Sequence, residues 1–281
     1  MLLRTVIPLS IAKKTVVFLC IVFILLAPGL TTRANGSEEE IETLGFTEID
    51  DVYTAAKHVQ SLKEAPSSIS VITDEDIRHY GYRHLTDAVN NIGGFYTYSD
   101  RNYDYVGVRG FARLGDYGNR VLQLIDGHTL NDNIYGSFVL GHNFGVDMDL
   151  VKRIEFVRGP GSALYGSNAV FGMVNVITKE GKDIDGLRTK IEGGSFNTYS
   201  STMTYGKAYG DHTDLLISAN FMNSRGQDFF YPELNNPPSS DGWARDADGE
   251  RARKFLLKAT FHELTVLANG NWREKNVATG S

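Results

Sequence analysis

Residues 151–179 restrict the fold of this chain more than any other segment. Their sequence, VKRIEFVRGPGSALYGSNAVFGMVNVITK, contains four glycines between Gly159 and Gly172. Glycine adopts positive φ angles that other residues avoid, and proline interrupts strands and helices. The segment therefore predicts tight backbone geometry between short elements. The predicted elements are a strand at 154–157, a glycine-rich break, one helical turn at 162–165 and a strand at 172–178.

The first 34 residues have the pattern of a secretory signal peptide. Basic residues precede an apolar run at 15–26, and Thr32-Arg33-Ala34 provides a small-residue cleavage site. The run is shorter than the about 20 apolar residues that a membrane-spanning helix needs, although a retained N-terminal anchor is the alternative. Cleavage would remove Cys20, the only cysteine, and would exclude disulfides and thiolate metal sites.

The charge of the exported chain argues against nucleic acid as a partner. Cleavage would remove four basic and no acidic residues, so the formal net charge would change from −6 to −10. An acidic chain without a basic cluster is a poor binder of nucleic acid.

Residues 65–182 show the mixed helix and strand signals of a domain that can fold alone. A strand is predicted at 68–72, and Thr73 with Asp76 forms a capping pattern for a helix ending near Gly81. A second helix from Leu85 is expected to close at Gly93-Gly94. Further strands are predicted at 105–108 and 121–125, the second turned by Asp126-Gly127. The acidic residues 35–64 lack periodicity and predict a flexible segment.

Beyond residue 186, apolar and polar residues alternate with a period of two, which gives each strand one apolar and one polar face. Tight turns are expected near Gly210-Asp211 and at His262-Glu263, with one long connection at 226–251. The predicted strands lie near 187–194, 198–209, 213–224, 253–262 and 264–273.

A soluble antiparallel sandwich would produce the same alternation. Long strands, Tyr and Trp near strand ends, and alternating short and long connections favour a transmembrane barrel instead. Five strands would leave unpaired edges in lipid, so further strands are expected beyond residue 281.

Four segments together resemble the plug domain of TonB-dependent outer-membrane transporters. They are APSSISVITDEDIRHYG at 65–81, VRGF at 108–111, LIDGHTLND at 124–132 and RGPGSALYGSNAVFG at 158–172. The resemblance implies an α+β plug domain at 65–182, followed at 183–281 by the first antiparallel strands of a transmembrane β-barrel of the 22-strand type.

The same resemblance implies structural roles for a set of charged, glycine and tyrosine positions. The charged side chains are expected to be paired or hydrated within the barrel, because an isolated buried charge is costly. Ordinary ion pairing at strand edges is the alternative. The matching residues are Arg109, Gly110, Asp126, Gly127, Arg153, Glu155, Arg158, Gly159, Gly161, Tyr165 and Gly166.

Residues 51–55 resemble the short energy-coupling box that precedes such plugs, within the flexible segment 35–64. An extended segment can add a strand to the sheet of a partner, which implies a TonB-type inner-membrane energy coupler. A plain linker is the alternative. The box residues are Asp51, Val52, Tyr53, Thr54 and Ala55.

Residues 95–104 and 133–138 match the apical loops of the family by position. Both mix aromatic faces with polar groups, as ligand sites do. The candidate substrate-binding residues are Tyr98, Arg101, Tyr103, Tyr135 and Phe138.

The implied function is energised uptake of a scarce solute across the outer membrane of a Gram-negative bacterium, with outer-membrane lipid around the barrel. A siderophore–iron complex is the expected cargo and cobalamin the next candidate. A non-transporting periplasmic binding or signalling module and a secreted enzyme are the alternatives.

No catalytic constellation or metal site is recognisable in the sequence. Gly161 and Gly166 have the spacing of a phosphate loop, but Ser167-Asn168 follow where Lys-Ser/Thr is required. The histidines contain no His-x-x-x-His pair, and no Gly-x-Ser-x-Gly occurs. We therefore expect no enzymatic activity and no cofactor.

Overall fold

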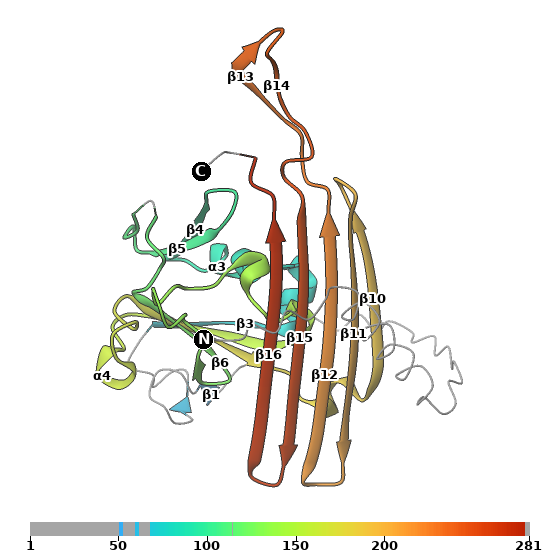
Figure 1. Cartoon of the computed structure of the whole chain (residues 1–281). Helices are drawn as coiled ribbons and strands as arrows, with labels where there is room; N and C mark the ends of the chain where they lie inside the picture. The colour runs from blue at the N-terminus through green and yellow to red at the C-terminus, as the bar shows by residue number, and fades with distance from the viewer. Residues whose placement is uncertain (1–50, 53–59, 62–67, 114, 279–281) are drawn as a thin grey trace, which may run out of the picture. The chain divides into compact units, whose positions relative to one another are not determined.

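The computed structural model describes residues 51–52, 60–61, 68–113 and 115–278. Two short strands, β1 (Asp51–Val52) and β2 (Gln60–Ser61), pair antiparallel. No helix in the described residues is long and apolar enough to cross a membrane. From residue 68 onward the chain forms two structures. A mixed domain spans 68–184, and a long antiparallel sheet follows it (Figure 1).

The mixed domain is built on a five-stranded sheet in the order β3-β8-β9-β6-β7. β6 and β9 are parallel and the other neighbours are antiparallel. β8 and β9 are largely buried: Phe156 and Val174 lie in the apolar core, and the buried polar residues include Glu155 and Asn175. The strands are β3 (Ser68–Thr73), β6 (Val121–Ile125), β7 (His128–Thr129), β8 (Val151–Arg158) and β9 (Gly172–Thr178).

Two helices follow β3, and the first begins as the sequence predicts. In α2 (Asp74–Tyr80), the Thr73 hydroxyl accepts from the Asp76 amide at 3.1 Å and the Asp76 carboxylate accepts from the Thr73 amide at 2.9 Å. The helix ends at Gly81, which has a φ of 66°. The predicted end of α3 (Leu85–Asn90) at Gly93-Gly94 is wrong, because Asn91 and Ile92 form tight turns back to Ala88 and Val89.

Several short elements complete the mixed domain. The residues predicted as an apical loop at 95–104 instead form a hairpin of β4 and β5, and the predicted boundary at residue 182 falls inside α5. The short elements are β4 (Phe95–Ser99), β5 (Asp104–Val108), the 3₁₀ helices η1 (Gly141–Asn143) and η2 (Met148–Leu150), α4 (Ser162–Tyr165) and α5 (Gly181–Ile184).

The long sheet has the order β10-β11-β12-β15-β16, which confirms the five strands expected from the alternation. The long connection carries an additional hairpin that the sequence did not reveal, and this hairpin extends beyond the end of the sheet (Figure 1). The strands are β10 (Gly186–Gly194), β11 (Thr198–Tyr209), β12 (Thr213–Ser224), β15 (Glu250–Phe261) and β16 (Leu264–Lys275), with β13 (Phe229–Asn236) and β14 (Ser240–Ala244) in the hairpin.

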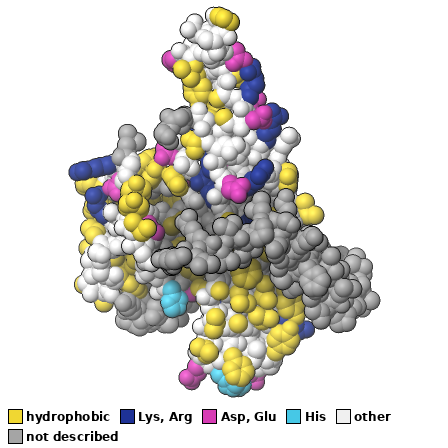
Figure 2. All heavy atoms as spheres, in the orientation of Figure 1, with side chains coloured by type: hydrophobic (Ala, Val, Ile, Leu, Met, Phe, Trp, Pro, Cys, Tyr) yellow, Lys and Arg dark blue, Asp and Glu magenta, His cyan; other side chains and the backbone are white. Residues whose placement is uncertain are grey.

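The long sheet has a polar inner face and an apolar outer face. Thr202, Thr204, Ser218 and Asn220 are buried on the inner face, where Thr204 and Ser218 hydrogen-bond across the strands at 2.8 Å. The outer face exposes large apolar side chains, which Figure 2 shows gathered over the lower part of the sheet. They include Ile191, Tyr199, Phe255, Val266 and Trp272. This arrangement is the reverse of a soluble sandwich and is that of a membrane barrel wall.

The mixed domain and the long sheet share one apolar cluster and several close backbone contacts. Leu216 and Leu256 from the sheet belong to the same buried cluster as Phe156 and Val174. The Asp214 carboxylate on β12 accepts from the Gly181 and Lys182 amides at 2.5 and 2.8 Å. α5 is therefore held directly against the sheet.

Glycine is required at the centre of this contact. A methyl group at Gly181 would lie 2.1 Å from the Leu215 carbonyl oxygen. Overpacking of this kind typically costs about 1–3 kcal/mol. We expect Gly181→Ala to lower the thermal unfolding midpoint of the chain in detergent by several degrees.

Gly193→Ala on β10 is the matched control. No heavy atom lies within 4 Å of its added methyl group, so its effect should stay within about 0.5 kcal/mol. Equal midpoints for the Gly181 and Gly193 variants would contradict the proposed packing.

Candidate functional site

The β4–β5 hairpin ends in a turn that Asp100 organises. Its carboxylate accepts from the amides of Asn102 and Tyr103 at 2.9 and 2.6 Å and from the Tyr105 hydroxyl at 2.7 Å. Partial burial opposes ionisation, but these hydrogen bonds hold the pKa of Asp100 below its ordinary value. The ordered turn presents Arg101, with a φ of 73°, and Tyr103 at its exposed tip.

A second loop, at 132–137, is organised in the same way by Asp132. Its carboxylate accepts from the amides of Ile134, Tyr135 and Ser137 at 2.9, 2.8 and 2.6 Å. Hydrogen bonding from Ser137 first, and then from the Tyr135 and Ile134 amides, lowers the pKa of Asp132 to about 2. The loop presents Tyr135, whose residue surface is 59% exposed.

A third segment, formed by residue 113 and residues 115–118, contacts both the β4–β5 hairpin and the second loop, and the sequence analysis missed it. The Tyr98 hydroxyl donates to the Arg113 carbonyl oxygen, and the Tyr117 ring stacks on Tyr135 with 4.9 Å between centroids. Positive φ angles at Gly115 and Gly118 shape the segment. The spacing of these two glycines around an exposed tyrosine was the available signal for a loop.

The tip of the β4–β5 hairpin also contacts the long sheet and its hairpin. The Arg101 guanidinium lies 4.2 Å from the ring centroid of Phe229 on β13. The Arg273 guanidinium on β16 lies 5.8 Å from the ring centroid of Tyr103. Both are cation–π distances. We call the half-buried Tyr98 and the exposed residues Arg101, Tyr103, Tyr117 and Tyr135 the apical cluster.

Phe138 does not share this surface. It is 4% exposed and belongs to the buried apolar cluster of the mixed domain. Its expected place among the exposed substrate-binding side chains is therefore wrong for this structure. The apolar ring of Phe138 stabilises the core. The sequence did not indicate this burial, because the residues before Phe138 are mostly polar or glycine.

Asp126 forms the principal charged contact between the mixed domain and the long sheet. Lys258 on β15 donates to the Asp126 carboxylate and to the Thr178 hydroxyl, both at 3.0 Å. Asp126 also accepts from the Thr178 amide at 2.8 Å and from its hydroxyl at 2.6 Å. The turn at Asp126 and Gly127, with φ angles of 47° and 82°, aims the carboxylate at this position.

A second contact joins two histidines to the inner face of the sheet. The Asn271 amide donates to the carbonyl oxygens of His142 and Asn143 at 2.9 and 2.8 Å. The His84 and His142 rings meet edge-on with centroids 4.3 Å apart, and they line a cavity of about 230 Å³ that Lys254 also borders.

The environment disfavours protonation of both imidazoles. Burial, and then the positive charge of Lys254, lower the pKa of His84. Burial, followed by the influence of His84 and Lys254, places the pKa of His142 well below its usual range. Burial has the opposite effect on the nearby carboxyl of Asp147, whose pKa is raised.

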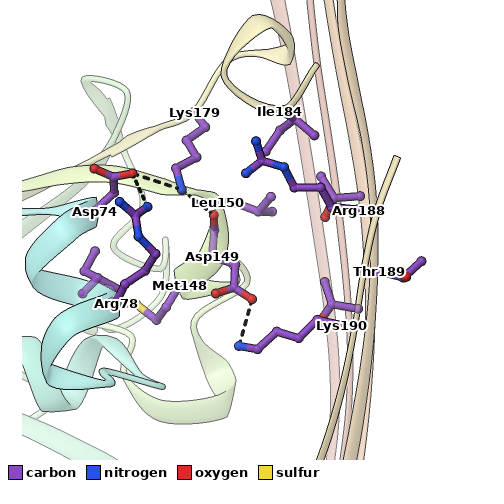
Figure 3. A pocket seen from close by; sticks show the side chains of 13 residues that line it. Asp74, Arg78, Met148, Asp149, Leu150, Lys179, Ile184, Arg188, Thr189 and Lys190 are labelled. Atoms are coloured by element: carbon purple, nitrogen blue, oxygen red, sulfur yellow. Dashed lines mark hydrogen bonds and ion pairs between the residues drawn. The ribbon is translucent and has the colours of Figure 1, made fainter. Parts of the chain in front are cut away.

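A third contact surrounds a cavity of about 240 Å³ (Figure 3). Lys190 from the long sheet reaches across to Asp149 at 2.9 Å, and Lys179 donates to the Asp149 carbonyl oxygen at 3.0 Å. Asp74 lies between Arg78 at 2.6 Å and Lys179 at 3.4 Å. The charged side chains of this cavity pair with one another, so its geometry suits docking of the domain.

Residues 61–173 match the sequence profile described as the TonB-dependent receptor plug domain. This match makes residues 61–173 similar to the plug domain of TonB-dependent receptors. The mixed domain is therefore called the plug domain from here on.

Two curated relatives are similar to this chain over part of its length. The vitamin B12 transporter BtuB of Vibrio vulnificus is 28% identical over 185 residues, which cover 65% of this chain and 29% of that protein. The iron-regulated outer membrane virulence protein of Vibrio cholerae is 35% identical over 133 residues, covering 46% of this chain and 20% of that protein.

A solved structure supports the fold. The ferripyoverdine receptor of the outer membrane of Pseudomonas aeruginosa superimposes with a TM-score of 0.58 at 16% identity, over 80% of this chain and 27% of that one. The chain thus spans less than a third of the length of each of these proteins.

The residues that carry the plug resemblance hold the plug strands together. Arg153 pairs with Glu155 at 2.9 Å, and Glu155 is fully buried. Arg158 donates to the Ser70 hydroxyl and the Gly93 carbonyl oxygen at 2.9 and 2.8 Å. Arg158 therefore joins β8 to the edge strand β3 and to the loop after α3, whereas Arg153 and Glu155 pair along β8.

The remaining positions of that set determine backbone geometry. Positive φ angles occur at Arg109, Gly110, Gly159 and Gly166, and a methyl group at Gly161 would lie 2.7 Å from the Met173 sulfur. Tyr165 is partly buried against the smaller apolar cluster that contains Met173. The Arg109 amide donates to the Gly94 carbonyl oxygen at 2.8 Å, and its side chain is exposed.

The structure describes only part of the expected energy-coupling box. Asp51 and Val52 form β1 and pair with Ser61 and Gln60. Tyr53, Thr54 and Ala55 lie outside the described residues.

Lys258→Met is expected to weaken plug docking, because it leaves the largely buried Asp126 carboxylate without its cation. Hydrogen bonds to charged groups are worth about 1.5–3 kcal/mol. Hydrogen exchange should accelerate at residues 125–128 and 177–179. Lys207→Met removes an exposed lysine from β11 and serves as the control. Unchanged exchange in the Lys258 variant would contradict this role.

Acidification is expected to loosen the His84–His142 contact. Below the ordinary histidine pKa of about 6.5, the unfolded chain binds protons that the folded imidazoles do not bind. The free energy of unfolding therefore decreases as the pH is lowered from about 6.5 toward the lowered pKa values of the folded histidines. The slope is at most about 1.4 kcal/mol per pH unit for each histidine. Stability should be independent of these groups above about pH 7.

Hydrogen exchange of the α3 amides between pH 7.5 and 5.5, corrected for intrinsic rates, measures this loss. The variant His84→Gln/His142→Gln should show a shallower pH dependence, because it lacks the two imidazoles that bind protons on unfolding. It retains Asp147 and the other charged groups, so their contribution is the same in both proteins. Equal slopes in the wild type and the variant would refute the assignment. The charged groups that act on this pair are Asp87, Asp104, Glu250, Lys254, Arg273 and Lys275.

Proposed function

We propose that the chain is the plug and first wall strands of an outer-membrane receptor that imports a scarce solute, with energy supplied by a TonB-type inner-membrane coupler. The observation that carries this proposal is the reversed polarity of the long sheet. Its polar inner face contacts the plug through Lys258 and Asn271, and its outer face exposes Ile191 and Trp272. A barrel wall that holds a plug and faces lipid requires a polar inner face and an apolar outer face.

Export would follow from a signal peptide at residues 1–34, and the apolar outer face would contact outer-membrane lipid. The short turns at 210–212 and 262–263 would face the periplasm, and the β13–β14 hairpin would lie outside the cell. Residues 65–182 would act as the plug, and 183–281 as the N-terminal part of the barrel.

The proposed cargo is a siderophore–iron complex, with cobalamin as the alternative. The names of the relatives include a vitamin B12 transporter and a ferripyoverdine receptor, so relatives of both kinds support these candidates. The apical cluster offers tyrosine faces and the Arg101 guanidinium, groups that suit a ligand with aromatic or anionic parts. Tyr98, Arg101, Tyr103 and Tyr135 are its proposed contacts, and Tyr117 joins them.

Coupling is proposed to occur by strand addition at residues 51–55. An extended segment offers its backbone donors and acceptors to the edge of the coupler's sheet, and a pull on it is transmitted to β3. Such a mechanism requires no cofactor and no catalytic residue, so enzymatic activity is not proposed.

Val52→Pro separates coupling from binding. Proline removes the backbone N–H that strand addition needs, whereas Val52→Thr retains it. In cells producing the full-length receptor, we expect Val52→Pro to abolish energy-dependent uptake of radiolabelled ferric siderophore while surface binding in the cold is unchanged. Arg101→Ala/Tyr103→Ala should instead lower binding itself.

Uptake that persists after deletion of the inner-membrane coupler would refute energised transport. Binding without energy-dependent uptake by the wild type would favour a non-transporting binding or signalling module. The same assay with labelled cobalamin distinguishes the two proposed cargoes.

A further inference from the structure

Two histidines that are fifty residues apart in sequence meet at the short-turn end of the long sheet. His212 ends the β11–β12 turn and His262 begins the β15–β16 turn. β12 and β15 are neighbours, and their register ends with Thr213 opposite Phe261. His212 and His262 are the next opposed positions, and the His262 amide donates to the His212 carbonyl oxygen at 2.7 Å.

The two imidazole rings are stacked in a solvent-exposed position. Their centroids are 4.8 Å apart with 13° between the ring planes, and the ring centroids of Phe261 and His262 are 4.4 Å apart at 73°. The backbone hydrogen bond and the positive φ of 54° at His262 hold the two side chains on neighbouring turns. Because imidazole lone pairs lie in the ring plane, coordination of one ion by both rings requires rotation about their exposed side-chain bonds.

Imidazole is a preferred ligand of copper, nickel and zinc ions. We propose that His212 and His262 form a two-imidazole site for a divalent ion of this class, with water in the remaining coordination positions. Asp211 and Glu263 adjoin the pair in sequence and add negative charge that favours a cation. The ion would link the two turns and so stabilise the pairing of β12 with β15.

The site differs from closed structural metal centres. No group of three or more His, Cys, Asp or Glu side chains in the part of the chain that the structure describes is arranged to hold a metal. Two protein ligands leave open positions, so the bound ion should exchange readily. The His84–His142 pair is less suitable, because Lys254 borders its cavity. The proposal does not depend on transport.

Calorimetric titration of the full chain, in detergent and without a polyhistidine tag, tests the site with NiCl₂ and ZnCl₂. We expect one bound ion per chain. His212→Asn and His262→Asn should each weaken metal binding at least about tenfold. Mutation of a residue that only hydrogen-bonds to a metal ligand already lowers metal affinity about 10- to 100-fold. Asparagine tolerates the positive φ at 262.

His128→Asn is the matched control, because His128 is an exposed histidine of β7 outside the pair. It should bind like the wild type. Metal should raise the thermal unfolding midpoint of the wild type and of this control but not of the double variant His212→Asn/His262→Asn. Comparing midpoints without metal checks that the double variant folds. Equal metal binding by the wild type and the folded double variant would overturn the proposal.

Discussion

The polar inner face of the long sheet is the constraint on which the rest of the structure depends. A buried polar group without a partner costs free energy, so this face must be matched by hydrogen-bonding groups. The plug supplies them from several elements: the Asp126 carboxylate for Lys258, the His142 and Asn143 carbonyl oxygens for Asn271, and the Gly181 and Lys182 amides for Asp214. The position of the plug against the sheet is therefore determined largely by directional hydrogen bonds and by charge pairing.

A hydrogen-bonded interface would also suit the proposed transport, in which the plug is pulled. Exchanging a protein–protein hydrogen bond for bonds to water costs only about 0.5–1.5 kcal/mol net. The contact at α5 is different, because Gly181 and Gly206 allow backbone to approach backbone where a side chain would collide. The chain thus combines a tight contact where plug and sheet are covalently continuous with exchangeable polar contacts elsewhere.

Much of the fold could be predicted because local signals and tertiary environment agree. The bounds of α4, β6, β9, β11 and β12 coincide with those expected from glycine placement and alternation. The β13–β14 hairpin was missed because Pro232 and the Pro237-Pro238 pair suppress the strand signal. β4 was missed because residues 95–104 match a loop of the resembled family by position. Its pairing with β5 depends on the tertiary structure.

By itself, the sequence determined the class of each segment: glycine-jointed strands and helices in the first part, and strands with one apolar and one polar face in the second. These properties depend on residue type and spacing, which are local. Only the tertiary structure decided that Phe138 is buried, that Tyr117 joins Tyr135, that Lys258 reaches Asp126, and that His212 meets His262. Such contacts depend on strand register and domain docking, and no short stretch of residues encodes either.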